Sequence, residues 1–459
     1  MLNYQYQSEY EWHPLYKHVM MIKSLYMECT HDSCSYNFEE WLNTVKANFH
    51  DEDGAIASLS NIFAPLDMTI YKHYVLFKYK GYIELSDMGY GGDFFELYNG
   101  LYRECRSIVF DVKNDTIELA SLAKFKNYGE DEGSWSANNI KDKYGSAIKV
   151  FITNKMDGSY QQYRYDEKED EVIGSGSSAL DREESWRLTD GYHLLSSNYS
   201  RMLKDYPDYT FIFEYISPKN PIVVKYTADQ EGLYLLAARN TKTGKEMDYT
   251  SLLCFASWYG VKITDSYEET LESILKATKD YTSDEKEGWV IDMININNSH
   301  FRVKIKTDDY VLLHKALSNM VSPNAVIQAL SDGKYDDFIA KVPVAYIELI
   351  ESYKNNILEY LQTLEYVTDW WYNLAEHSLT TAFKDNDRKK IMVWIDAYVP
   401  KFLASRVKNI YLGKPNSGLL RKGFCYKYAE IMKNLTLVRK YKEDIDSGKI
   451  FLRGLDKEN

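Results

Sequence analysis

The sequence predicts an α+β protein whose last third is helical. At 459 residues the chain is too long for a single hydrophobic core, so two or three domains are expected. Between residues 68 and 306, aromatic and β-branched residues gather in short runs that are typical of strands, including 209–216, 222–226 and 301–306. From about residue 310 onward, apolar residues recur at helical spacing. We therefore expect an N-terminal helical extension (1–60), a strand-rich domain (61–318) and an all-helical C-terminal domain (319–459).

Composition is that of an ordinary globular protein, with 45% hydrophobic and 27% charged residues. No run approaches the roughly 18 apolar residues that span a bilayer, and the first residues lack the features of a signal peptide. The five cysteines are scattered, odd in number and without metal-ligand spacing. These features predict reduced thiols in a cytoplasmic protein without a membrane segment.

Charge is distributed unevenly along the chain. The formal net charge of −13 argues against binding nucleic acid over the whole surface. Residues 401–442 nevertheless contain eleven Lys and Arg against one acid, Glu430. The basic residues of this stretch are Lys401, Arg406, Lys408, Lys414, Arg421, Lys422, Lys427, Lys433, Arg439, Lys440 and Lys442. A solvated helix face is one interpretation, and the interleaved aromatic residues make a nucleic-acid surface the other.

A lysine turn stands at the centre of the strand-rich region. Lys155-Met156-Asp157-Gly158-Ser159 joins two predicted strands, residues 148–154 and 159–166. A lysine amine at the end of a strand can form a covalent bond to phosphorus or carbonyl carbon once it loses its proton. The neighbouring glycine allows backbone to approach a ligand closely. Taken alone, the same five residues also fit an exposed turn without a function.

Further charged residues follow the lysine turn in a fixed order. Glu214 stands inside a run of strand formers, and Glu287-Gly288 opens another strand. Lys304 and Lys306 fall on one face of the strand over 301–306, because side chains alternate along a strand. Two adjacent ammonium groups repel each other unless an anion lies between them, so this pair predicts an anion site.

Taken in order, this set resembles the covalent nucleotidyltransferases, the superfamily of DNA ligases, RNA ligases and capping enzymes. It is most similar to the phage RNA ligase 1 family, the tRNA-repair ligases of T-even phages. The lysine turn resembles that family's Lys-Glu-Asp-Gly-Ser, and Glu287-Gly288-Trp289-Val290 resembles its Glu-Gly-Tyr-Val. Lys304-Ile305-Lys306 matches its Lys-Ile-Lys. The similarity covers about residues 70–340 and is weak beyond them.

The resemblance implies a fold and a reaction. The fold is a nucleotidyltransferase domain of ATP-grasp-like antiparallel sheets with an ATP cleft between them, followed by the helical domain, which would bind tRNA. In the reaction, Lys155 attacks the α-phosphorus of ATP and forms lysyl-AMP. The AMP then moves to an RNA 5′-phosphate, and a 3′-hydroxyl displaces it. The implied partners are RNA with such ends, nicked tRNA above all, and a separate end-healing enzyme.

The resemblance also implies roles for individual residues. Glu287 would ligate Mg²⁺ or Mn²⁺, Glu214 would bind the ribose, and Asp157 would orient Lys155 or the metal. The triphosphate would be neutralised by Arg106, Lys124, Lys304 and Lys306, and the last two would also lower the pKa of Lys155. The nucleotide would further contact Tyr79 and Asn154, and a second divalent ion would bind Asp336 and Asp337.

Three departures from the family pattern leave an alternative open. Ser107 follows Arg106 where the family has glycine, Pro221 replaces an arginine, and Ser175-Gly176-Ser177-Ser178 replaces Ser-Lys-Gly-Ser. The missing lysine favours a non-catalytic RNA-binding or virion-assembly protein that retains the fold. The complete set of acids and lysines favours an enzyme. A DNA ligase or capping enzyme is disfavoured, because the OB-fold of those enzymes needs short strands where this chain has helical patterns.

Overall fold

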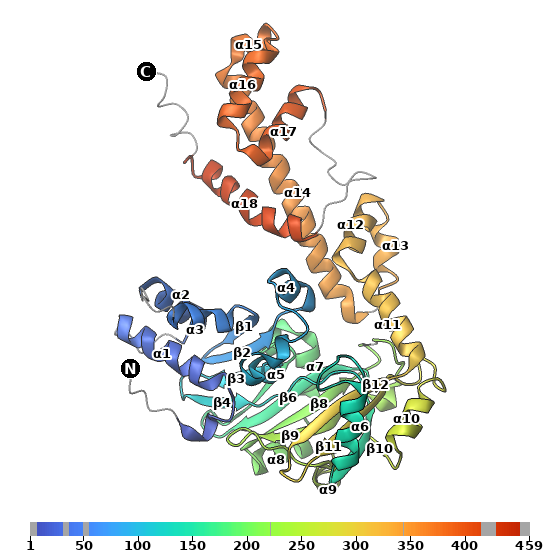
Figure 1. Ribbon diagram of the computed structural model, residues 1–459. Coiled ribbons are helices and arrows are strands. Elements are labelled where there is room, and N and C mark those ends of the chain that lie inside the picture. Colours follow the sequence, from blue (N-terminus) through green and yellow to red (C-terminus); the bar gives the residue numbers. More distant parts are fainter. Residues whose placement is uncertain are drawn as a thin grey trace. The chain divides into compact units, whose positions relative to one another are not determined.

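The computed structural model describes residues 7–30, 36–48, 55–220, 222–342, 344–414 and 428–449 (Figure 1). The chain divides into two compact units, residues 1–313 and 314–459. All strands of the described residues belong to the first unit, where they form three four-stranded sheets, and the second unit is helical. The predicted class, antiparallel α+β followed by a helical region, is confirmed. The division into three domains with separate roles, residues 1–60, 61–318 and 319–459, stays a prediction.

The first sheet, in the order β1-β2-β3-β4, is wholly antiparallel. Its strands are β1 (Leu66–Tyr71), β2 (Tyr74–Tyr79), β3 (Ile108–Asp111) and β4 (Thr116–Leu119). The N-terminal helices α1 (Tyr16–Thr30), α2 (Phe38–Asn48) and α3 (Ala55–Phe63) lie beside this sheet (Figure 1). Val19, Trp41 and Phe63 share one buried core with Phe77 and Phe110 of the sheet. The N-terminal helices are therefore packed into the first unit.

Two further antiparallel sheets carry the motifs, and the lysine turn joins them. One has the order β10-β5-β11-β12 and the other β7-β6-β8-β9. Their strands are β5 (Lys149–Lys155), β6 (Ser159–Asp166), β7 (Glu171–Gly176), β8 (Tyr209–Ile216), β9 (Gly232–Asn240), β10 (Ser266–Tyr267), β11 (Gly288–Ile294) and β12 (His300–Lys306). Because β5 ends at Lys155 and β6 begins at Ser159, the chain changes sheet within three residues.

Alternation along these strands separates an apolar face from a polar one. Trp289, Ile291 and Ile305 pack with Ile140 and Leu271 of neighbouring helices. On the other sheet, Phe211, Phe213 and Tyr215 pack with Leu188, Met202 and Leu252 of the helices that cover it. The residues between these positions, among them Glu214, Val290 and Lys304, project from the opposite faces into a pocket between the sheets.

Helices of the first unit connect and cover the strands. They are α4 (Tyr82–Asp87), α5 (Leu101–Glu104), α6 (Ala137–Ser146), α7 (Trp186–Leu194), α8 (Ser197–Asp205), α9 (Tyr249–Tyr259) and α10 (Leu271–Ala277). Helix α11 (Asp308–Met320) begins in the first unit and ends in the second. Residues 222–226, predicted as a strand, are not one, and the reason lies in the contacts of Asp157 described below.

The second unit is built around the long helix α14 (Val344–Ser378). Its other helices are α12 (Pro323–Ser331), α13 (Tyr335–Ile339), α15 (Thr380–Lys384), α16 (Arg388–Tyr398), α17 (Lys401–Tyr411) and α18 (Tyr428–Asp446). Ile350, Ile357 and Leu364 of α14 form its core with Val407 and Leu435. Among the described helices, none combines the length and the apolar content needed to cross a membrane.

Candidate active site

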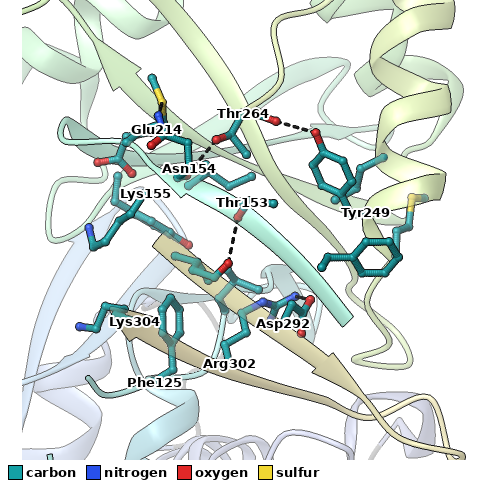
Figure 2. Close-up of a pocket in the computed structure, with 18 of the residues that line it drawn as sticks. Phe125, Thr153, Asn154, Lys155, Glu214, Tyr249, Thr264, Asp292, Arg302 and Lys304 are labelled. Atoms are coloured by element: carbon teal, nitrogen blue, oxygen red, sulfur yellow. Dashed lines mark hydrogen bonds and ion pairs between the residues drawn. The ribbon is translucent and has the colours of Figure 1, made fainter. Parts of the chain in front are cut away.

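A pocket opens between the two sheets that the lysine turn connects. Side chains of both sheets line it, including Thr153, Asn154, Lys155, Tyr160, Glu214, Leu236, Val290, Asp292, Arg302, Lys304 and Lys306. In Figure 2 the amino groups of Lys155 and Lys304 lie at the same end of the pocket, and Glu214 is close to Lys155. The predicted cleft between antiparallel sheets is therefore present.

Glu287 joins the two predicted lysine motifs. Its Oε2 lies 2.6 Å from Nζ of Lys155, and its Oε1 lies 3.0 Å from Nζ of Lys306. The central strand β11 places it there, because Gly288 stands opposite Lys155 on one side and Lys306 on the other. The carboxylate is 3% exposed. Burial alone would raise its pKa, but the two ammonium groups hold the pKa below its usual range.

The pKa of Lys155 is shifted in the direction opposite to the predicted one. The sequence predicts that Lys304 and Lys306 lower the pKa of Lys155, and burial does act in that direction. The carboxylates of Glu287 and Glu214 outweigh burial and raise the pKa of Lys155 above its ordinary value. The expected lowering is wrong for the ligand-free protein, whose Lys155 is an ammonium group held in an ion pair.

The predicted lowering occurs at Lys304 instead. Burial, followed by the charges of Lys124, Lys155 and Arg106, lowers the pKa of Lys304 to about 7. Its ammonium group lies 5.6 Å from the ring centroid of Phe125. A buried cation repelled by other cations is stabilised by any anion that enters the pocket. This arrangement supports the prediction of an anion site.

Glu214 is held next to the lysine turn by a close backbone contact. Its Oε1 accepts a hydrogen bond of 3.1 Å from the backbone N–H of Gly158. A Cβ atom on Gly158 would lie 2.3 Å from the carbonyl oxygen of Tyr215, so the turn can approach β8 only with glycine at this position. Burial raises the pKa of Glu214 to about 7, although Lys155 opposes the shift.

The carboxylate of Asp157 accepts hydrogen bonds from backbone N–H groups of a loop outside the lysine turn. Its Oδ2 accepts hydrogen bonds of 2.8 Å from the N–H groups of Val223 and Val224, and the Tyr310 hydroxyl donates to its Oδ1 at 2.9 Å. These bonds tie the lysine turn to the loop of residues 222–226, and they take the N–H groups of Val223 and Val224 from any strand pairing. We interpret Asp157 as a residue that positions Lys155 through the backbone.

Replacing Asp157 with alanine is expected to destabilise the first unit by about 2–4 kcal/mol, because three buried donors lose their acceptor. Tyr310→Phe removes only one of these bonds and is expected to cost about 1 kcal/mol. Urea unfolding of both variants checks this order. Equal effects of the two substitutions would contradict the role given to Asp157.

The remaining predicted nucleotide contacts divide into two groups. Arg106 lines the pocket, and its guanidinium lies 5.5 Å from the ring centroid of Phe125 and 5.2 Å from that of Tyr160. Asn154 also lines it. Tyr79 and Lys124 are not among the residues that line this pocket, although Nζ of Lys124 lies 5.6 Å from the ring centroid of Tyr79. The charge of Lys124 still acts on Lys304.

Lys286 is a site residue that sequence reasoning missed. Its Nζ donates hydrogen bonds of 2.8 Å to Oδ1 of Asn154 and of 2.8 Å to the hydroxyl of Tyr267, so it fixes the amide of Asn154. Burial lowers the pKa of Lys286 to about 8. The signal available in the sequence was its position directly before Glu287.

Charged residues of the second unit give less support to the predictions. Asp336 and Asp337 are exposed in the first turn of α13, and no third acid, histidine or cysteine of the described chain groups with them. Of the predicted basic surface, Lys408, Arg439 and Lys442 form ion pairs with Asp396, Glu359 and Asp446. Arg421, Lys422 and Lys427 lie outside the described residues. Both the second ion and the tRNA surface stay predictions.

The donors at this site fit a hard divalent cation. Glu214 lines this pocket and has one oxygen bonded to a single backbone N–H, and Glu287 lines an adjoining pocket that shares Lys155 with it. Mg²⁺ and Mn²⁺ prefer such oxygen ligands. The lysine at a strand end, the two glutamates and the Lys-x-Lys strand are thus brought together between two antiparallel sheets, as the sequence predicts for a nucleotidyltransferase site.

Comparison with known proteins shows which family and which solved structures parts of this chain resemble. Residues 104–310, the segment that holds the site, match the family model described as RNA ligase. A protein of Autographa californica nuclear polyhedrosis virus, described as a bifunctional polynucleotide kinase/RNA ligase, is 33% identical over 134 residues. That match covers 29% of this chain and 18% of the viral protein, so the chain spans less than a fifth of its relative.

Solved structures of RNA ligases are similar as well. An archaeal ATP-dependent RNA ligase has a TM-score of 0.38 at 15% identity, covering 65% of this chain and 70% of the other. The Naegleria gruberi RNA ligase with pyrophosphate has a TM-score of 0.34 at 17% identity, covering 43% of this chain and 58% of the other.

Proposed function

We propose that this protein is an ATP-dependent RNA ligase that joins RNA 5′-phosphate and 3′-hydroxyl ends. The observation that carries the proposal is the 2.6 Å contact of Lys155 with Glu287, beside a pocket that Lys155 lines together with Glu214, Lys304 and Lys306. The match of residues 104–310 to the RNA ligase family supports it.

In the first step Lys155 Nζ forms a bond to the α-phosphorus of ATP, and the bond from that phosphorus to the bridging oxygen of pyrophosphate breaks. The amine must first lose the proton that Glu287 and Glu214 hold on it. Neutralising the charge of Glu287 weakens that hold and lowers the pKa of Lys155. A Mg²⁺ or Mn²⁺ ion at Glu287 would supply this charge and polarise the phosphoryl oxygens.

The pocket's other residues serve the same step and the two that follow. Arg106, Lys304 and Lys306 neutralise the triphosphate and the charge that develops on the leaving pyrophosphate. Glu214 binds the ribose. An RNA 5′-phosphate oxygen then attacks the lysyl-AMP phosphorus and frees the Lys155 amine. A 3′-hydroxyl finally attacks the activated 5′-phosphate, and AMP leaves.

The biological substrate belongs to the proposal too. We assign nicked tRNA as the RNA and a separate enzyme as the source of healed ends. The basic residues of 401–442 support a tRNA-gripping role for the second unit, in part only, because three of them are already ion-paired. Comparing the sealing of nicked tRNA with that of a short oligonucleotide, with and without residues 314–459, tests the assignment.

Incubation with α-labelled ATP and Mg²⁺, followed by denaturing electrophoresis, tests the chemistry. Label is expected on the wild-type protein and absent from Lys155→Ala. Adding 5′-phosphorylated RNA should discharge the label. The absence of label with any divalent ion would reject the ligase proposal.

A non-catalytic RNA-binding protein is the second candidate, and the segment 175–178 favours it. Ser107 Oγ donates a 2.8 Å hydrogen bond to the carbonyl oxygen of Ser177, and Gln162 Nε2 donates to Ser175 Oγ at 2.9 Å. Ser107 and the segment 175–178, which both depart from the family pattern, therefore contact each other. Gly176 stands where the family has a lysine, so this position offers no basic side chain. Label that RNA fails to discharge would trace a defect of the later steps to this segment.

Affinity for metal-free ATP is expected to fall as the pH rises through 7. Lys304, with a pKa of about 7, loses its charge in the free protein above that pH, whereas bound phosphates raise its pKa. Linkage gives up to about tenfold weaker binding per pH unit until the pKa of the bound state is reached. Titration calorimetry in EDTA measures it, and Lys304→Gln should lose this part of the pH dependence. An unchanged profile in Lys304→Gln would contradict the assignment.

A further inference from the structure

A cluster of buried acids lies outside the pocket, where the first sheet meets β6. We propose that Asp111, Glu118 and Asp166, with His73 beside them, bind a divalent cation that is separate from those predicted at Glu287 and at Asp336 and Asp337. One oxygen from each acid lies within 4.8 Å of the others. Because metal–oxygen bonds are about 2.0–2.6 Å long, this spacing admits a single shared ion.

The acids come from three strands of two sheets. Asp111 ends β3, Glu118 belongs to β4, and Asp166 ends β6. All three are at most 3% exposed. An ion between them would cross-link the N-terminal sheet to the sheet that carries Glu214, so its role would be structural.

His73 supplies an independent indication of a ligand. The residue is 8% exposed, and its Nε2 has no hydrogen-bond partner. This nitrogen lies 3.8 Å from Asp111 Oδ2 and 3.9 Å from Glu169 Oε1, and both distances are too long for a hydrogen bond. A buried ring nitrogen left unpaired beside a carboxylate is explained by an ion that takes both as ligands.

The charges of the cluster do not balance. Glu118 accepts from Arg164 at 2.5 Å, and Asp166 accepts from the neutral Tyr74 hydroxyl at 2.9 Å. Among the described residues, the hydrogen-bond donors to Asp111 are neutral groups of residues 113 and 114. Three carboxylates against one guanidinium leave two excess negative charges in a buried place, which is unfavourable unless a cation compensates them. A divalent cation supplies the two missing positive charges.

Three carboxylates and one imidazole suit Mn²⁺ better than Mg²⁺, which favours oxygen ligands alone.

Counting bound Mn²⁺ by the electron paramagnetic resonance of the free ion tests the proposal on the full chain. Glu118→Gln keeps the shape of the side chain and is expected to lose one bound ion or weaken it at least tenfold. The exposed Glu167→Gln, which removes the same charge nearby, should bind as the wild type does. The site should also survive in Glu287→Gln, which separates it from the proposed ligase chemistry.

Thermal unfolding provides a second measurement. Mn²⁺ is expected to raise Tm relative to EDTA in the wild type and in Glu167→Gln but less in Glu118→Gln and in Asp111→Asn, whose amide oxygen can still accept from the turn. Circular dichroism verifies that each variant is folded. Equal Mn²⁺ counts and equal Tm shifts in all four proteins would overturn the proposal. So would a Glu118→Gln variant that is stabilised in EDTA without losing an ion, because a proton would then balance the cluster.

Discussion

Replacing Glu287 with glutamine is expected to slow lysyl-AMP formation at least about 100-fold, equivalent to about 2.7 kcal/mol of activation free energy. The carboxylate bridges Lys155 and Lys306 with one oxygen each, and an amide offers an acceptor to only one of them. The substitution also removes an anionic oxygen ligand from the proposed Mg²⁺ site. Single-turnover labelling with α-labelled ATP measures the rate.

The pH dependence distinguishes the two roles of Glu287. Its charge raises the pKa of Lys155, so at limiting Mg²⁺, where no ion offsets that charge, the wild-type rate should still increase with pH above the range in which an ordinary lysine titrates. Removing that charge lowers the pKa of Lys155 and moves the inflection to lower pH. Glu272→Gln, an exposed acid paired with Lys276, serves as the control and should leave the rate within twofold. A Glu287→Gln rate equal to that of the wild type would remove Glu287 from the site.

Strand periodicity was enough to predict which side chains share a face. Lys304 and Lys306 alternate with buried Val303 and Ile305, and Glu214 alternates with Phe213 and Tyr215, as expected from a period of two. The change from strand-type runs to apolar residues at helical spacing also separated the strand-rich region from the helical one. These features depend on near neighbours in the chain, and the sequence therefore contains them.

Contacts between distant segments could not be read in this way. The Lys155–Glu287 ion pair joins residues 132 positions apart, and it depends on the register that sets Gly288 opposite Lys155. The same pair reversed the predicted direction of the Lys155 pKa. Asp157 likewise finds its partners 66 and 67 positions away in residues 222–226, which is why that apolar run forms a loop. The register between paired strands, and the contacts of a side chain with a distant loop, form only when the chain folds.

The largest expected effect on stability is that of Gly288→Ala. Gly288 has φ +152°, and a Cβ atom added to it would lie 2.0 Å from the carbonyl oxygen of Ile305 and 2.7 Å from Cα of Lys306. Both neighbours are backbone atoms of β12, so the clash is relieved only by separating the two strands. We expect a loss of at least about 3 kcal/mol in the free energy of unfolding.

Gly145→Ala is the matched control for this substitution. Gly145 lies in α6, where an added methyl group would have no atom within 4 Å, and alanine is favoured over glycine there by about 1 kcal/mol. Urea unfolding should therefore shift to lower midpoint for Gly288→Ala and stay or rise for Gly145→Ala. An unchanged midpoint for Gly288→Ala would show that β11 and β12 separate at little cost. The register that brings Glu287 to both lysines would then be too loose to hold Lys155 for reaction.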